Sequence, residues 1–176
     1  MDFREPSALI LTLPMDLVGG VQSKARFLAA HLNEYGYHVT IASYVGRSST
    51  KDLNVGWVMS FFGKKGRIEL CESENDIQHI FVGSRFPGTE FTYTENSASW
   101  RRVLGYHNKI IAVGGTPLIA YPAASLGKKF ILWCADDLTG DRRARMMTMS
   151  RSRRFIDKAW ILPKLIQQQS VVLNSG

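Results

Sequence analysis

The sequence predicts an α/β fold, in which a mostly parallel sheet of about six or seven strands carries helices on both faces. Short apolar segments alternate along the chain with segments whose apolar residues recur every three or four positions. In two places a pair of glycines lies between an apolar segment and the helical segment that follows it. Strands that alternate with helices in this way usually pair in parallel, so the pattern indicates a Rossmann-like arrangement.

The first strand, helix and second strand follow one another closely. Residues 7–13, Ser-Ala-Leu-Ile-Leu-Thr-Leu, form an apolar run between two prolines, which favours a buried strand. After Gly19 and Gly20 the apolar residues follow helical spacing, and Gly36 is placed to end that helix. Residues 38–42 then begin a second strand.

The same criteria predict the remaining elements. Further strands are expected at residues 78–82, 109–113, 130–134 and 170–174, and further helices at residues 97–106, 117–126 and 142–169. Ser97 is a suitable helix cap, and Pro117 suits a first helical position. Pro163 must kink or break the last helix. Residues 44–66 are expected to form a long loop around a short strand or helix.

Length and composition indicate one soluble domain. The chain has 176 residues, of which 45% are hydrophobic, and its 22 Lys and Arg against 15 Asp and Glu give a formal net charge of +7. That charge favours anionic partners such as phosphates or an anionic membrane face. There is no apolar stretch long enough to span a membrane and no signal-peptide pattern. Cys71 and Cys134 form neither a disulfide framework nor a zinc motif, so a reducing cytoplasm is expected.

The glycine pair at 19–20 is the first candidate site. A helix N-terminus carries unpaired N–H groups and a partial positive charge, and glycine lets an anion approach them without an intervening side chain. A tight strand-to-helix turn without a ligand explains the pair equally well. The segment lacks the Gly-x-Gly-x-x-Gly fingerprint, and the chain has no Walker A motif, which argues against NAD and ATP.

Two more strand ends carry residues suited to a ligand, because parallel α/β sheets bind ligands at the carboxyl ends of their strands. Gly114-Gly115 follows one strand and Asp136-Asp137 follows another. A metal site that adds Asp141 to the two aspartates is one alternative, and a solvated acidic loop that caps the next helix is another.

A basic segment follows. Six arginines are interleaved with methionines: Arg142, Arg143, Arg145, Arg151, Arg153 and Arg154. This pattern suits an amphipathic helix that contacts anionic lipid headgroups or a phosphorylated acceptor, and it suits a solvated charged face equally well. Nucleic acid is not expected, because the aromatic residues are scattered and no recognition motif is present.

The stretch "GGVQSKARFLAAHLNEYGYHVTI", residues 19–41, resembles the opening of retaining GT-B glycosyltransferases. It is most similar to the large bacterial family 4, which includes sucrose-phosphate synthases and mannosyltransferases. Residues 108–132, "NKIIAVGGTPLIAYPAASLGKKFIL", are similar to a later segment of that family. The final "SVVLNSG", residues 170–176, resembles the strand that ends the first of the two GT-B domains.

The resemblance implies that residues 1–176 form the N-terminal, acceptor-side domain, one half of a GT-B fold. The donor-binding domain, with its two spaced glutamates, has no counterpart here, so this chain alone is expected to transfer no sugar. The implied reaction moves a sugar from a nucleotide-sugar to a hydroxyl of a sugar or lipid-linked acceptor, without a metal or another cofactor. The implied setting is cytoplasmic, in peripheral contact with an anionic membrane.

The resemblance also implies roles for particular residues. The backbone of Gly19, Gly20 and Val21 faces the donor phosphates across the cleft. Relatives carry a histidine near the donor sugar where this chain has Asp136 and Asp137, so these aspartates are the candidate catalytic residues. Acceptor or anion binding is expected at Gly114, Gly115, Thr116, Arg142 and Arg143. The competing hypothesis is a non-catalytic α/β module that binds an anionic ligand or a membrane surface.

Overall fold

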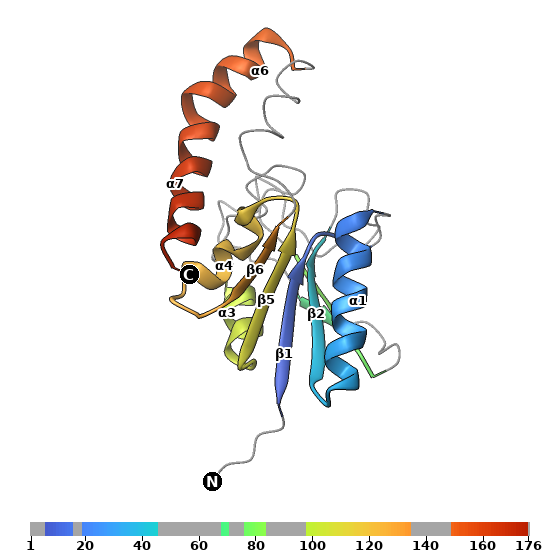
Figure 1. Ribbon diagram of the computed structural model, residues 1–176. Helices are drawn as coiled ribbons and strands as arrows, with labels where there is room; N and C mark the ends of the chain where they lie inside the picture. The colour runs from blue at the N-terminus through green and yellow to red at the C-terminus, as the bar shows by residue number, and fades with distance from the viewer. Residues whose placement is uncertain are drawn as a thin grey trace.

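The computed structural model describes residues 6–15, 19–45, 68–70, 76–83, 98–134 and 149–175. These residues contain a six-stranded sheet in the order β3-β4-β2-β1-β5-β6. The strands are β1 (Ser7–Thr12), β2 (His38–Tyr44), β3 (Ile68–Leu70), β4 (Gln78–Val82), β5 (Lys109–Gly114) and β6 (Ile131–Cys134). All neighbouring strands pair in parallel except β3 and β4. The predicted α/β class with a mostly parallel sheet is therefore confirmed (Figure 1).

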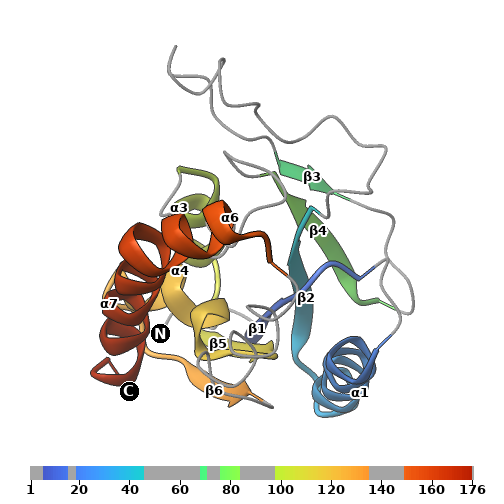
Figure 2. The same cartoon turned by 90° about the horizontal axis from the view of Figure 1, so that it is seen from above.

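Helices cover both faces of the sheet. One face carries α1 (Gly20–Glu34), as Figure 2 shows. The other carries α3 (Ala98–Gly105), the 3-10 turn η2 (Pro117–Ala120), α4 (Tyr121–Ala124) and α7 (Leu162–Leu173). The chain enters α7 through α6 (Arg151–Ile156) and a π-helical turn, η3 (Asp157–Ile161), and α6 projects beyond the carboxyl ends of the strands (Figure 1).

The core has one layer on each side of the sheet, because successive strand residues point to opposite faces. Leu9 and Leu11 of β1 belong to the larger cluster, which also contains the fully buried Trp100 of α3. Ile10, between them, packs in the second cluster with Ala25 of α1. Burial on both faces explains why β1 reads as a continuous apolar run rather than as an alternating one.

The predicted helix ends at glycine are confirmed. Gly36 after α1 has φ +78°, and Gly127 after α4 has φ +63°, a region that residues with a Cβ rarely adopt. The helix predicted at residues 117–126 is a 3-10 turn followed by one short α-helical turn.

The strand predicted at residues 170–174 is wrong, because these residues continue and then cap α7. Valine-rich sequence favours a strand by intrinsic propensity, which tertiary packing often overrides. In α7 the buried residues are Leu165, Gln168 and Val172, at helical spacing, and Val172 joins the larger core cluster. The helix places Leu165, Gln168 and Val172 on one buried face. In a strand, successive side chains would instead point to opposite faces of the sheet.

Pro163 does not break the helical segment, which runs without interruption from residue 151 to residue 173. It lies in the first turn of α7, directly after the π-helical turn, where the hydrogen-bond pattern changes. The helical segment predicted from residue 142 is described only from residue 149 onward. Ser97 and residues 46–66 of the predicted long loop also lie outside the described residues.

Candidate functional site

The order in which strands are added to the sheet reverses between β1 and β5, which are parallel neighbours. From β1 the chain passes through α1 to β2 on one side, then to β4, and returns to place β5 on the other side of β1. Thr12 of β1 pairs in register with Val113 of β5, so both strands reach the same edge of the sheet. Ligands of open α/β sheets bind at this kind of switch point. The turn before α1 and the turn after β5 therefore begin at adjacent strand ends.

The start of α1 is exposed at Gly19 and Gly20. Gly19 is the N-cap residue, its backbone is extended (φ 179°, ψ 172°), and no side chain in the described part of the chain caps the helix. A Cβ added at Gly20 would have no heavy atom within 4 Å. Neither glycine has a positive φ. The turn conformation therefore does not require glycine at either position, and the space in front of Gly20 is empty of described atoms.

Two side chains of α1 hold the loop that precedes it. The Gln22 Nε2 donates to the Pro14 carbonyl oxygen at 3.0 Å, and the Arg26 Nη2 donates to the Met15 carbonyl oxygen at 3.2 Å. Gln22 is buried, and a Cβ at Gly19 would lie 3.0 Å from its Oε1. The base of the loop is therefore attached to the first two turns of the helix.

Thr12 is a buried polar residue that pairs in register with the buried Ser43 of β2. Its side chain lies on the α1 side of β1, two residues after Ile10, at the end of the strand where α1 begins. The residue is 0% exposed, and its Oγ1 has no hydrogen-bond partner among the described residues. A buried hydroxyl without a partner costs about 1–3 kcal/mol. Sequence reasoning missed Thr12, although a hydroxyl near the end of an aliphatic strand was the available signal.

The second glycine pair has a partly structural explanation. A Cβ at Gly114 would lie 2.7 Å from the Ile119 Cγ2, so close packing of η2 on β5 excludes a side chain there. A Cβ at Gly115 would meet nothing within 4 Å. Thr116 caps η2 without a side-chain hydrogen bond, and η2 is only four residues long, too short to supply a helix N-terminus for an anion. Ligand binding by residues 114–116 stays a prediction.

Lys24 and Trp133 form a contact that the sequence did not indicate. The Lys24 ammonium of α1 lies 5.4 Å from the centroid of the Trp133 ring, within the range of a cation–π interaction. Trp133 is the penultimate residue of β6 and is 40% exposed. The two residues are 109 positions apart in the chain. They meet because the sheet places β6 next to β5, which is itself next to β1.

Four predicted site residues, Asp136, Asp137, Arg142 and Arg143, lie outside the described residues. Val21 is described: its side chain packs against the second core cluster, so only its backbone is available at the helix start. Within the described ranges, no three His, Cys, Asp or Glu side chains are grouped so as to hold a metal ion. No helix in those ranges is long and apolar enough to cross a membrane. Comparison of the chain with protein-family models, curated proteins and solved structures found no significant match.

Proposed function

We propose that the chain is the acceptor-side domain of a two-domain glycosyltransferase of the GT-B type, which transfers a sugar from a nucleotide-sugar to an acceptor hydroxyl. The observation that carries the proposal is the open start of α1 at the switch point between β1 and β5. Among the described residues, neither backbone conformation nor packing requires glycine at position 20, whereas a phosphate needs the space that its missing side chain leaves.

Phosphate binding at this position has a direct chemical purpose. Negative charge develops on the diphosphate as its bond to the sugar breaks, and the N–H groups and dipole of α1 stabilise that charge. The proposed participants are the backbone N–H groups of Gly20 and Val21. Asp136 and Asp137, which follow β6, are proposed to bind sugar hydroxyls. Gly114, Gly115, Thr116, Arg142 and Arg143 are proposed to contact the acceptor.

The variant Gly20→Val tests the phosphate site. We expect its affinity for inorganic pyrophosphate to fall at least about tenfold, because the branched side chain occupies the space in front of the N–H groups. Titration of the full chain, followed by the amide signals of residues 20 and 21, measures this affinity. The melting temperature should change little, since a Cβ at this position meets no atom of the described residues within 4 Å.

Gly105→Val is the matched control, because Gly105 ends α3 and also has open space around its missing Cβ. It should leave the pyrophosphate affinity unchanged. Equal affinity in wild type and Gly20→Val would contradict the phosphate site. Turnover of a nucleotide-sugar by the purified 176-residue chain would contradict the assignment of donor binding to a separate domain.

One observation favours the second candidate, a non-catalytic module that binds an anionic membrane surface. Helix α6 projects from the body and exposes Arg151, Arg154 and Phe155, the last of which is 74% exposed. Basic and aromatic side chains together are typical of helices that contact anionic lipid. The two candidates differ in the residues they need, so they can be tested separately.

A further inference from the structure

The outer face of α1 carries a continuous stripe of exposed side chains. From Ser23 to the C-cap Tyr35, exposed residues recur at alternating spacings of three and one, which places them on one side of the helix. This α1 stripe consists of Ser23, Arg26, Phe27, Ala30, His31, Glu34 and Tyr35. Helices α3, α4 and α7 lie on the opposite face of the sheet, so they leave the stripe uncovered (Figure 2).

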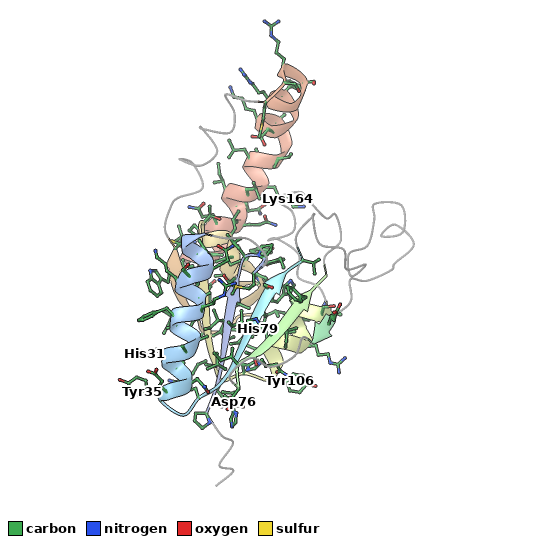
Figure 3. The ribbon with its side chains drawn as sticks, turned by 90° about the vertical axis from the view of Figure 1, so that its right-hand side faces the viewer. His31, Tyr35, Asp76, His79, Tyr106 and Lys164 are labelled. Atoms are coloured by element: carbon green, nitrogen blue, oxygen red, sulfur yellow. The ribbon has the colours of Figure 1, made fainter. Side chains whose placement is uncertain are left out.

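Three rings of the stripe are held in place by contact with one another. The His31 ring stacks on Phe27 at 5.9 Å between centroids and meets the edge of Tyr35 at 4.9 Å. Figure 3 shows His31 and Tyr35 following one another along the helix. Phe27 and Tyr35 are 66% and 70% exposed, and a row of exposed rings is typical of protein–protein interfaces. A partner would immobilise few additional side chains on binding, because these rings already restrict one another.

The charges of the stripe make it complementary to itself. Arg26 lies four residues before Ala30 and Glu34 four residues after it, about 6 Å along the helix axis in each direction. If a second copy of α1 runs antiparallel with Ala30 at the two-fold axis, Arg26 of each copy lies level with Glu34 of the other. A parallel pair would place like charges opposite each other. The Arg26 Nη2 donates to the Met15 carbonyl oxygen, and the guanidinium has further N–H donors for a carboxylate.

The same register also fits the remaining side chains. Ala30 is small, so it lets two helices approach to the interaxial separation of about 8–10 Å that packed helices adopt. Phe27 of one copy then lies at a level midway between His31 and Tyr35 of the other copy. The three rings lie on one flank of the stripe, and the two-fold axis brings the equivalent flanks of both copies to the same side.

We propose that the chain forms a symmetric homodimer in which the α1 stripes of two copies pack antiparallel around Ala30. Each end of the contact contains an Arg26–Glu34 pair, and the rings of both copies interleave beside it. The stripe is smaller than the roughly 20–30 residues a side of a standard interface, so the dimer should be weak, with a dissociation constant between about 1 µM and 1 mM. This inference does not use the proposed phosphate position, so it can fail without the proposed function and stand without it.

Exchange of the two charges tests the antiparallel register. Arg26→Glu and Glu34→Arg should each weaken self-association at least about tenfold, because each places like charges together at both ends of the contact. An equimolar mixture of the two variants should associate about as well as wild type, since each contact then joins one acidic and one basic side chain. Both variants keep a net positive charge, because each changes the formal +7 by only two units, so attraction between oppositely charged molecules does not explain recovery. Sedimentation velocity from about 10 µM to about 1 mM measures the association.

Matched controls change the same side chains elsewhere. Arg101→Glu alters the net charge as Arg26→Glu does, at an exposed position of α3 on the other face of the sheet, and it should leave the association unchanged. Phe27→Ala should weaken the dimer, whereas Tyr106→Ala should not, although Tyr106 is 72% exposed. Thermal unfolding of each variant confirms that the comparison refers to folded protein.

A cysteine at the proposed axis gives a second test that leaves the charges intact. Ala30→Cys should form a disulfide-linked dimer when diamide is added, which takes up the two protons and two electrons that the two thiols release. Ser23→Cys is the control on the same stripe, because Ser23 of the two copies would lie about 21 Å apart, far beyond the reach of a disulfide. Wild type measures any background from Cys71 and Cys134.

Three outcomes would overturn the inference. One is a wild-type chain that stays entirely monomeric at about 1 mM. Another is a dimer that both charge variants leave unchanged, which would place the interface elsewhere. The third is equal cross-linking of Ala30→Cys and Ser23→Cys, or a mixture of folded charge variants that fails to associate, because either would contradict the antiparallel register around Ala30.

Discussion

At the scale of single residues, Thr12 is a polar residue in the buried interior of the sheet. The other residues of β1 from Ala8 to Leu11 are aliphatic and fully buried, and a valine would fit the same position with the same shape. A hydroxyl without a partner lowers stability there.

The variant Thr12→Val should raise the free energy of unfolding by about 1 kcal/mol, because it removes a buried hydroxyl that makes no hydrogen bond. Urea unfolding measures the effect.

Thr40→Val provides the contrast, since Thr40 is equally well buried but its Oγ1 donates to the Gln78 Oε1 at 3.4 Å. Loss of that contact should lower stability rather than raise it. A Thr12→Val protein that is less stable than wild type would show that the hydroxyl makes a stabilising hydrogen bond in the folded protein.

At the scale of the element, the exposed surfaces of α1 and α6 carry different kinds of side chain. On α1 the rings of Phe27, His31 and Tyr35 contact one another at i,i+4 spacing, with centroid distances of 5.9 Å and 4.9 Å. Figure 3 shows His31 and Tyr35 along the C-terminal half of that helix. Such contacts between side chains on one helix support the helix itself. The flank of α6, by contrast, presents basic side chains with one large exposed ring.

The α6 surface, defined here as Arg151, Arg154 and Phe155, should bind vesicles that contain anionic lipid, and this binding should weaken as salt rises, because screening shortens the reach of exposed charges. Replacing the two arginines by glutamine should reduce the affinity for anionic vesicles by up to about thirtyfold, at about 1 kcal/mol for each basic residue near the surface. Co-sedimentation with anionic and neutral vesicles measures the effect.

Lys128→Gln with Lys129→Gln is the matched control, because it removes the same charge from an exposed turn before β6. Equal loss of binding in both double variants would show that net charge, and not α6, attracts the vesicles. Equal binding to anionic and to neutral vesicles would contradict an electrostatic contact between α6 and lipid.

At the scale of the whole molecule, His107 couples stability to pH. It lies between α3 and β5, half-buried, and its Nδ1 is buried with no partner among the described residues. Burial lowers the pKa of His107 below its ordinary value of about 6.5, because the charged imidazolium loses hydration.

The free energy of unfolding should therefore fall as the pH drops below about 6.5, since the unfolded chain then takes up a proton that the folded protein binds less well. Above that pH the imidazole is neutral in both states and contributes no slope. Comparison of wild type with His107→Gln by urea unfolding between pH 5 and pH 8 isolates this contribution. A stability difference between the two that is independent of pH would contradict it.

The candidate site was predictable only in part. The glycines at 19–20 and 114–115 could be placed at strand ends from local pattern alone, because a strand, a glycine turn and a helix follow one another within a few residues. Lys24 and Trp133 could not be paired, because nothing in the sequence states that β6 lies two strands from β1. The lack of a partner for Thr12 is likewise a property of the packed interior.

The sequence by itself determined the α/β class, the first strand, helix and second strand, and the helix ends at Gly36 and Gly127, since hydrophobic period and glycine conformation act over a few residues. Only the tertiary structure decided that residues 170–173 are helical and that the crossover lies between β1 and β5. The physical reason is that the free energy gained by burying a side chain in the core outweighs the local preference of the residue for a strand. Val172 prefers a strand by propensity, yet it is buried in the larger core cluster as part of a helix.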